Sequence, residues 1–93
     1  MEKVIVFGVG RNYRKHIAQI ERKYDVVALV DNNWKKLQNG VQPVAIIQNK
    51  TYDFILVTPD VYGEILQQIR GLGVSEKRIK IMVNMPEFTN QRF

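Results

Sequence analysis

Two glycines and an arginine stand where a protein chain can bind a phosphate group. Gly8-Val9-Gly10-Arg11 follows a short apolar run and precedes a segment with helical periodicity. A turn from a strand into a helix leaves several amide N–H groups without partners, and the helix dipole makes that point attractive to anions. Gly8 permits the tight turn, and Gly10 removes a side chain that would hold a phosphate away. The guanidinium of Arg11 can bind phosphate through two hydrogen bonds, and we include the adjacent Asn12 in the predicted site.

Three more polar residues are expected beside this turn. Asp31 stands 21 residues after Gly10, at the end of a second apolar run, where a carboxylate can accept hydrogen bonds from ribose hydroxyls. Asn32 follows it, and Thr58 ends a further apolar run, where its hydroxyl could meet a sugar or a phosphate. Two structural alternatives stay open at these positions: Asp31 and Asn32 as a capped turn, and Thr58 as a helix cap.

Tyr13 departs from the usual pattern of this kind of turn. It occupies the place of a third glycine, which lets the helix pack closely on the strand. A tyrosine there should push the helix away from the strand or turn its ring into the core. The two-glycine turn is retained, whereas a tyrosine does not suit the close packing typical of dinucleotide sites.

Strands that alternate with helices must position these residues. Continuous apolar runs predict buried strands, and apolar residues at spacings of three and four predict amphipathic helices. The expected strands are 3–7, 26–30, a short one around 43–45, 53–57 and 79–83, and the expected helices are 11–24 and 60–72. This order predicts a small α/β, Rossmann-like, three-layer domain over residues 1–83, with a mostly parallel sheet of about five strands and helices on both faces. Residues 84–93 are interpreted as a C-terminal tail.

Size and composition restrict the classes of partner. The 93 residues suffice for one small domain. The net charge of +5 is spread over several segments, which indicates a solvated basic surface and argues against a nucleic-acid interface. There is no cysteine, no apolar run of the length needed to span a membrane, and no pattern typical of a secretion signal. We therefore expect a cytoplasmic protein without a membrane span.

The chain also resembles a known group of nucleotide-binding domains. The resemblance covers roughly residues 2–83 and is carried by the glycine turn, "VALVDNN", "NGVQPV", "DFILVTP" and "LGVSEKRI". It is similar to the N-terminal sugar-nucleotide-binding domain of bacterial sugar acyltransferases, and to the leading domain of nucleoside-diphosphate-sugar epimerases and dehydratases. The resemblance implies a UDP-sugar or NAD(P) as ligand and a role in surface polysaccharide biosynthesis.

No catalytic group is evident in the sequence. The resembling epimerases use a Tyr-x-x-x-Lys pair, and none of the four tyrosines has a lysine four residues later. The acyltransferases carry their catalytic repeats in a second domain. The single histidine, His16, is interpreted as a packed residue of the first helix, and no metal-ligand spacing appears.

Two interpretations of function follow. The first is a non-catalytic domain that binds a nucleotide or sugar nucleotide at the glycine turn. The second is an interaction or regulatory domain that keeps the fold without a ligand, with Tyr13 filling the pocket. In the second case the tail from Asn84 to Phe93 could contact a second copy or a partner domain.

Overall fold

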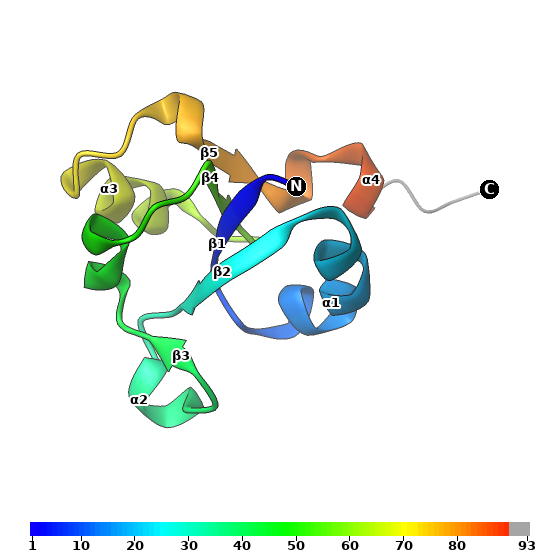
Figure 1. The fold of residues 1–93 in the computed structure, drawn as a ribbon, viewed down its shortest axis with the longest axis horizontal. Helices are drawn as coiled ribbons and strands as arrows, with labels where there is room; N and C mark the ends of the chain where they lie inside the picture. Colours follow the sequence, from blue (N-terminus) through cyan, green and yellow to red (C-terminus); the bar gives the residue numbers. More distant parts are fainter. Residues whose placement is uncertain (90–93) are drawn as a thin grey trace.

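The computed structural model describes residues 1–89 as an α/β domain built on one parallel sheet (Figure 1). The strands are β1 (Lys3–Phe7), β2 (Asp25–Val30), β3 (Val41–Gln42), β4 (Phe54–Val57) and β5 (Ile79–Ile81). The α-helices are α1 (Arg11–Lys23), α2 (Trp34–Leu37), α3 (Gly63–Gly71) and α4 (Pro86–Thr89). Three 3₁₀-helices complete it, namely η1 (Val44–Asn49), η2 (Glu76–Arg78) and η3 (Met82–Asn84).

The strand order is β3-β2-β1-β4-β5, and every neighbouring pair is parallel. The chain builds outward from β1 in one direction as far as β3, and then crosses to β4 on the other side of β1. The gap between β1 and β4 is therefore the point at which the winding direction reverses. This topology confirms the α/β fold and the five-stranded parallel sheet that the sequence predicts.

Each face of the sheet has its own apolar cluster, because alternate residues of a strand point to opposite faces. Val4 and Val6 of β1 join the cluster beneath α1, whereas Ile5 and Phe7 join the cluster beneath η1 and α3. Figure 1 shows α1 and α3 on opposite sides of the sheet. Burying one apolar stripe of each helix is the main favourable contribution to this arrangement.

Three elements differ from those expected. The strand expected around 43–45 is β3 at Val41–Gln42, and the residues after Pro43 form η1. The last strand, expected over 79–83, ends at Ile81, where η3 follows. The third strand ends at Gln42, because Pro43 has no N–H to continue the ladder and its carbonyl instead accepts a bond from Ile46 in the turn of η1. The helix expected from Asp60 begins at Gly63, which leaves Val61 outside the apolar stripe and 87% exposed.

The C-terminal segment packs on α1. Phe88 of α4 is buried in the cluster beneath α1, Lys23 forms an ion pair with Glu87, and the Gln19 side-chain amide donates to the Glu87 carbonyl at 2.6 Å. The hydrogen bond within this pair lowers the pKa of the Glu87 carboxyl below its ordinary value. It also raises the pKa of the Lys23 ammonium above its ordinary value. The packed unit thus continues past residue 83 into the segment interpreted as a tail. Phe93, which was expected to offer a contact to a partner, lies outside the described residues.

No helix in the described part of the chain is long and apolar enough to cross a membrane.

Candidate functional site

The register of the sheet brings the predicted site residues to one edge. Phe7 pairs with Val30 on one side and with Val57 on the other. The residues that follow these three, Gly8, Asp31 and Thr58, therefore leave the sheet next to one another. In parallel sheets, ligands bind beyond the carboxyl ends of the strands, where the winding direction reverses.

Gly8 is held by contacts within the chain. Its φ of +106° is a conformation that other residues rarely adopt, and its amide donates to the Val30 carbonyl at 2.9 Å. A Cβ at this position would lie 2.6 Å from Thr58 Oγ1 and 2.8 Å from Pro59 Cδ. Gly8 is thus required by the close approach of the chain that leaves β4.

Thr58 faces inward at this contact. It is 1% exposed, and its hydroxyl donates to the Gly8 carbonyl at 2.6 Å. The geometry gives this hydroxyl the role of holding the glycine turn against β4. The ligand contact expected for Thr58 remains a prediction.

Asp31 also serves the turn. One carboxylate oxygen accepts from the Val9 amide at 2.9 Å, and the other accepts from the Asn33 amide at 2.8 Å. The adjacent Asn32 exchanges two side-chain amide hydrogen bonds with Gln68 of α3, at 3.0 and 2.9 Å. Both residues connect the loop after β2 to neighbouring elements.

The second half of the turn is open. Gly10 is the N-cap of α1 and makes no side-chain cap, and a Cβ built on it would meet nothing within 4 Å. Within residues 1–89, the amide N–H groups of Gly10, Arg11 and Asn12 find no acceptor; the first bond of the helix runs from Arg14 N to the Gly10 carbonyl. These amides are the donors that the sequence predicts for a phosphate.

A cavity of about 220 Å³, the turn cavity, lies beside these amides. Its walls come from the start of α1 and the loop after β4, and they are formed by Gly10, Arg11, Asn12, Thr58, Pro59 and Asp60. The Asn12 side-chain amide joins α1 to that loop, because it donates to the Thr58 carbonyl at 2.9 Å and to Asp60 Oδ1 at 2.8 Å. The turn cavity thus occupies the crevice between β1 and β4.

Tyr13 turns its ring into the core. It is 6% exposed and belongs to the apolar cluster beneath α1, together with Val6, Ile20 and Leu56. Burial raises the pKa of its phenol, with a smaller contribution from the charge of Glu21. Of the two outcomes expected for a tyrosine in place of the third glycine, the structure shows the ring in the core, and Tyr13 does not line the turn cavity.

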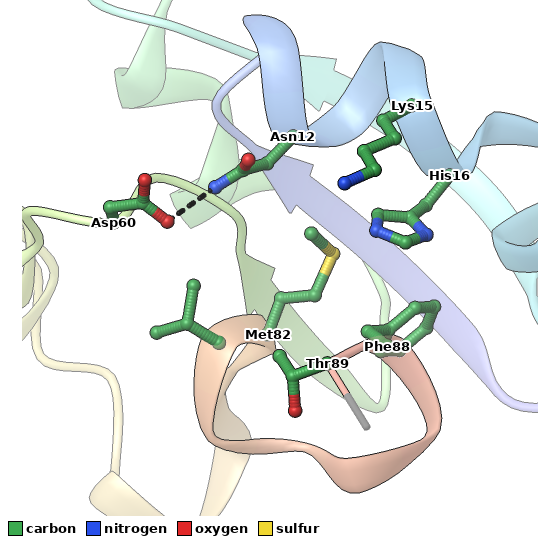
Figure 2. Close-up of a pocket in the computed structure, with 8 residues that line it drawn as sticks. Asn12, Lys15, His16, Asp60, Met82, Phe88 and Thr89 are labelled. Atoms are coloured by element: carbon green, nitrogen blue, oxygen red, sulfur yellow. Dashed lines mark hydrogen bonds between the residues drawn. The ribbon is translucent and has the colours of Figure 1, made fainter. Parts of the chain in front are cut away.

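A second and larger cavity adjoins the first. This His16 groove, about 450 Å³, lies between α1 and the segment η3–α4 and is lined by Asn12, Lys15, His16, Asp60, Met82, Val83, Phe88 and Thr89. It shares Asn12 and Asp60 with the turn cavity. Figure 2 shows Lys15 and His16 extending from α1 toward Met82 and Phe88 on the opposite wall.

The sequence interpretation did not place Lys15 and His16 in a site. The available signal was their spacing from Asn12, because residues at i, i+3 and i+4 share one face of a helix. That face adjoins the apolar stripe, because His16 lies three residues after Tyr13 and four before Ile20 and is buried with them. What the sequence could not indicate is that α4 folds back to form the opposite wall.

Metal binding has no support from the described residues, since residues 1–89 bring no group of three or more histidine, aspartate or glutamate side chains together.

Comparison with known protein families identifies a matching family. The family described as C2185-like, N-terminal, matches residues 1–80, which is most of the chain. A comparison with curated proteins finds no match.

Proposed function

We propose that this chain, which belongs to the C2185-like N-terminal family, binds the phosphate group of a nucleotide in the turn cavity and performs no chemistry alone. The observation that carries the proposal is the row of three unpartnered amides, Gly10 to Asn12, beside a cavity where the winding of the sheet reverses. Oriented amides at the N-terminus of a helix favour a bound anion.

The space and the charges around these amides suit the binding of a small anion. The space left by Gly10 is not needed by the fold, since among the described residues, apart from Gly10 and its two chain neighbours, no atom lies within 4 Å of a Cβ built there. Arg11 is exposed and lines the same cavity, so its guanidinium can add two charge-assisted hydrogen bonds to a phosphate. Asp60 contributes a negative charge to the opposite wall, and the Asn12 amide offsets part of it.

The remaining predicted residues act around that phosphate. Asp31 already accepts two amide hydrogen bonds, yet each carboxylate oxygen has two lone pairs and can accept a further bond from a ribose hydroxyl. Asn32 lies in the same loop and is exposed. Thr58 acts indirectly in this proposal, by holding Gly8 in place.

The class of nucleotide follows from the sequence resemblance. We retain a UDP-sugar or NAD(P) as the proposed ligand, a role in surface polysaccharide biosynthesis, and a cytoplasmic location. Tyr13 replaces the glycine typical of dinucleotide sites, and this favours the UDP-sugar.

A titration followed by ¹H–¹⁵N NMR tests the proposal. UDP, UDP-glucose, ADP and NAD are added separately, up to millimolar concentration, to the ¹⁵N-labelled chain. We expect at least one of them to shift the amide signals of Gly10, Arg11 and Asn12, while the signals of Gly71 and Gly73, at the far end of α3, stay in place. A ligand at about 100 times its Kd should also stabilise the fold by about 2.7 kcal/mol in a thermal-shift assay.

The ligand-free interaction domain is the second candidate. It is favoured by the side-chain groups at the sheet edge that are already paired within the chain, namely those of Asn12, Asp31, Asn32 and Thr58. Unchanged signals at Gly10 to Asn12 with all four nucleotides would support this candidate and contradict nucleotide binding.

A further inference from the structure

We propose that the His16 groove binds the hydroxyl-bearing sugar ring of a sugar nucleotide whose phosphate lies in the turn cavity. This inference rests on the proposed function, and it assigns new residues, Lys15, His16 and Asp60, to the recognition of one part of the ligand. The two cavities share the walls formed by Asn12 and Asp60, so one ligand can extend through both.

The hydrogen bonds around Gln19 fix the proton on the His16 ring. The Gln19 side-chain nitrogen donates to the Glu87 carbonyl at 2.6 Å, so its oxygen is the atom left to face His16 Nδ1, at 3.3 Å. An amide oxygen only accepts, and Nδ1 therefore carries the proton. In the neutral ring, Nε2 is then a hydrogen-bond acceptor.

His16 Nε2 is accessible from the groove. His16 is 9% exposed, and within residues 1–89 its Nε2 makes no hydrogen bond; since no buried side-chain nitrogen or oxygen there is without a partner, Nε2 keeps some exposed surface. Figure 2 shows the ring directed into the groove. The edge-to-face contact with Phe88, at 5.6 Å and 73°, holds the ring in this orientation.

The groove thus presents two hydrogen-bond acceptors, His16 Nε2 and the Asp60 carboxylate, and one cation, the Lys15 ammonium. Asp60 is an acceptor on the wall opposite His16, fixed by the Asn12 amide, and the Lys15 ammonium is a donor. The lone pair of Nε2 accepts a hydrogen bond, which a fully ionised phosphate cannot donate. Sugar hydroxyls both donate and accept, so they can satisfy all three groups.

The dimensions of the site also fit a sugar joined through phosphate. An α-helix rises 1.5 Å per residue, so His16 lies about 9 Å along α1 from Gly10, roughly the reach of a phosphate and the ring attached to it. Met82 and Phe88 give the opposite wall an apolar surface for the C–H face of such a ring.

Calorimetric titration with UDP and UDP-glucose tests the inference. We expect the intact chain to bind UDP-glucose about five- to tenfold tighter than UDP, as one or two additional hydrogen bonds would give. His16→Asn keeps a donor near the position of Nδ1 and removes Nε2, so the ratio of the two Kd values should fall below twofold. Lys15→Met should also lower the ratio, whereas the matched control Lys35→Met, on α2, should leave it unchanged.

The lone histidine of the chain allows a second test that needs no variant. In a long-range ¹H–¹⁵N spectrum of the intact chain, we expect the Nε2 signal to shift with UDP-glucose and to stay in place with UDP. Equal Kd values for the two ligands, or an unmoved Nε2 signal with UDP-glucose bound, would overturn the sugar site while leaving phosphate binding intact. Failure of both ligands to bind at millimolar concentration would instead overturn the proposed function together with this inference.

Discussion

The two glycines of the turn after β1 lie two residues apart and face opposite surroundings. Gly8 has a positive φ and is pressed against Thr58 and Pro59, where an added Cβ would overlap both residues. Gly10 has a φ of −91°, outside the left-handed region that favours glycine, and a Cβ there would meet no described atom within 4 Å beyond its chain neighbours. Gly8 is therefore needed for steric reasons within the fold, whereas Gly10 leaves space beside the turn that the fold does not use.

This difference separates the part of the turn that holds the fold from the part available to a ligand. The half around Gly8 is fixed by the hydrogen bonds of Gly8 with the Val30 carbonyl and the Thr58 hydroxyl. The Asp31 carboxylate accepts a hydrogen bond from the Val9 amide in the same half. The Gly10 half has amides without acceptors and open space beside them. Substitutions should therefore reduce stability in the first half and ligand binding in the second.

The largest loss of stability is expected for Gly8→Ala. The added methyl group would lie 2.6 Å from Thr58 Oγ1, and the backbone conformation is itself unfavourable for alanine. Steric overlap and the positive φ together should lower the free energy of unfolding by about 3 kcal/mol. Urea denaturation followed by circular dichroism measures this change.

Gly40→Ala is the matched control for that substitution. Gly40 also has a positive φ, +84°, but a Cβ there would meet nothing within 4 Å. It should lose only the backbone contribution, about 1 kcal/mol. Equal losses of unfolding free energy in the two variants would show that contact with Thr58 and Pro59 is not the reason for glycine at position 8.

A smaller loss is expected for Thr58→Val. Valine keeps the shape of the side chain and removes the hydroxyl that donates to the Gly8 carbonyl. The buried Gly8 carbonyl then lacks this hydrogen bond. This should cost about 1–2 kcal/mol of unfolding free energy. Thr89→Val, an exposed threonine of α4 with a hydroxyl bond to the Met85 carbonyl, is the comparison variant and should change stability by less. A loss at Thr89 as large as that at Thr58 would contradict the role given to Thr58.

The ion pair between Lys23 of α1 and Glu87 of α4 should contribute least, since its side chains are partly exposed at the surface. Glu87→Gln removes the ion pair with Lys23, whose partly exposed side chains are worth less than about 1 kcal/mol. The pKa of Glu87 is lowered by the Lys23 hydrogen bond, so the stabilisation is present above the ordinary value of 4.5 and is lost as pH falls through the lowered pKa. The pKa of Lys23 is raised by the same bond, so the stabilisation is also lost at the alkaline end, as pH rises through that raised pKa.

Unfolding free energies of the intact chain and of Glu87→Gln, measured between pH 3 and pH 8, check this prediction. The two curves should be separated by a small and constant amount near neutral pH and should converge in acid. A separation that widens as the pH falls would contradict the assigned pair.

The fold follows from the sequence because local pattern and tertiary packing agree in it. The apolar run of β1 and the stripe through Tyr13 and Ile20 each predict the element that forms. The sequence predicts the start of α3 and the end of β3 less accurately. These boundaries depend on contacts between distant segments, such as that of Asn12 with Asp60. Such contacts join residues far apart in sequence and leave no periodic signal.

The candidate site divides in the same way. The turn and its position at the sheet edge could be predicted, because Gly8 and Gly10 follow a strand and precede a helix. The pairing of Asp31 with the Val9 amide and the wall that α4 gives the His16 groove could not, since both depend on how distant segments meet. Tyr13 raised the question of a blocked pocket, and only the packing of α1 on the sheet shows where its ring lies.

The most direct test of the central claim compares Gly10→Ala with Gly71→Ala, another glycine at which an added Cβ meets nothing within 4 Å. Calorimetric titration of UDP-glucose into the intact chain and both variants gives the affinities, and urea denaturation gives the stabilities. The open turn predicts that neither variant is less stable than the intact chain, Gly71→Ala being somewhat more stable because alanine favours the helix, and that Gly10→Ala alone loses affinity, by at least about tenfold, or about 1.4 kcal/mol. Unchanged affinity in Gly10→Ala would contradict a phosphate bound at the start of α1.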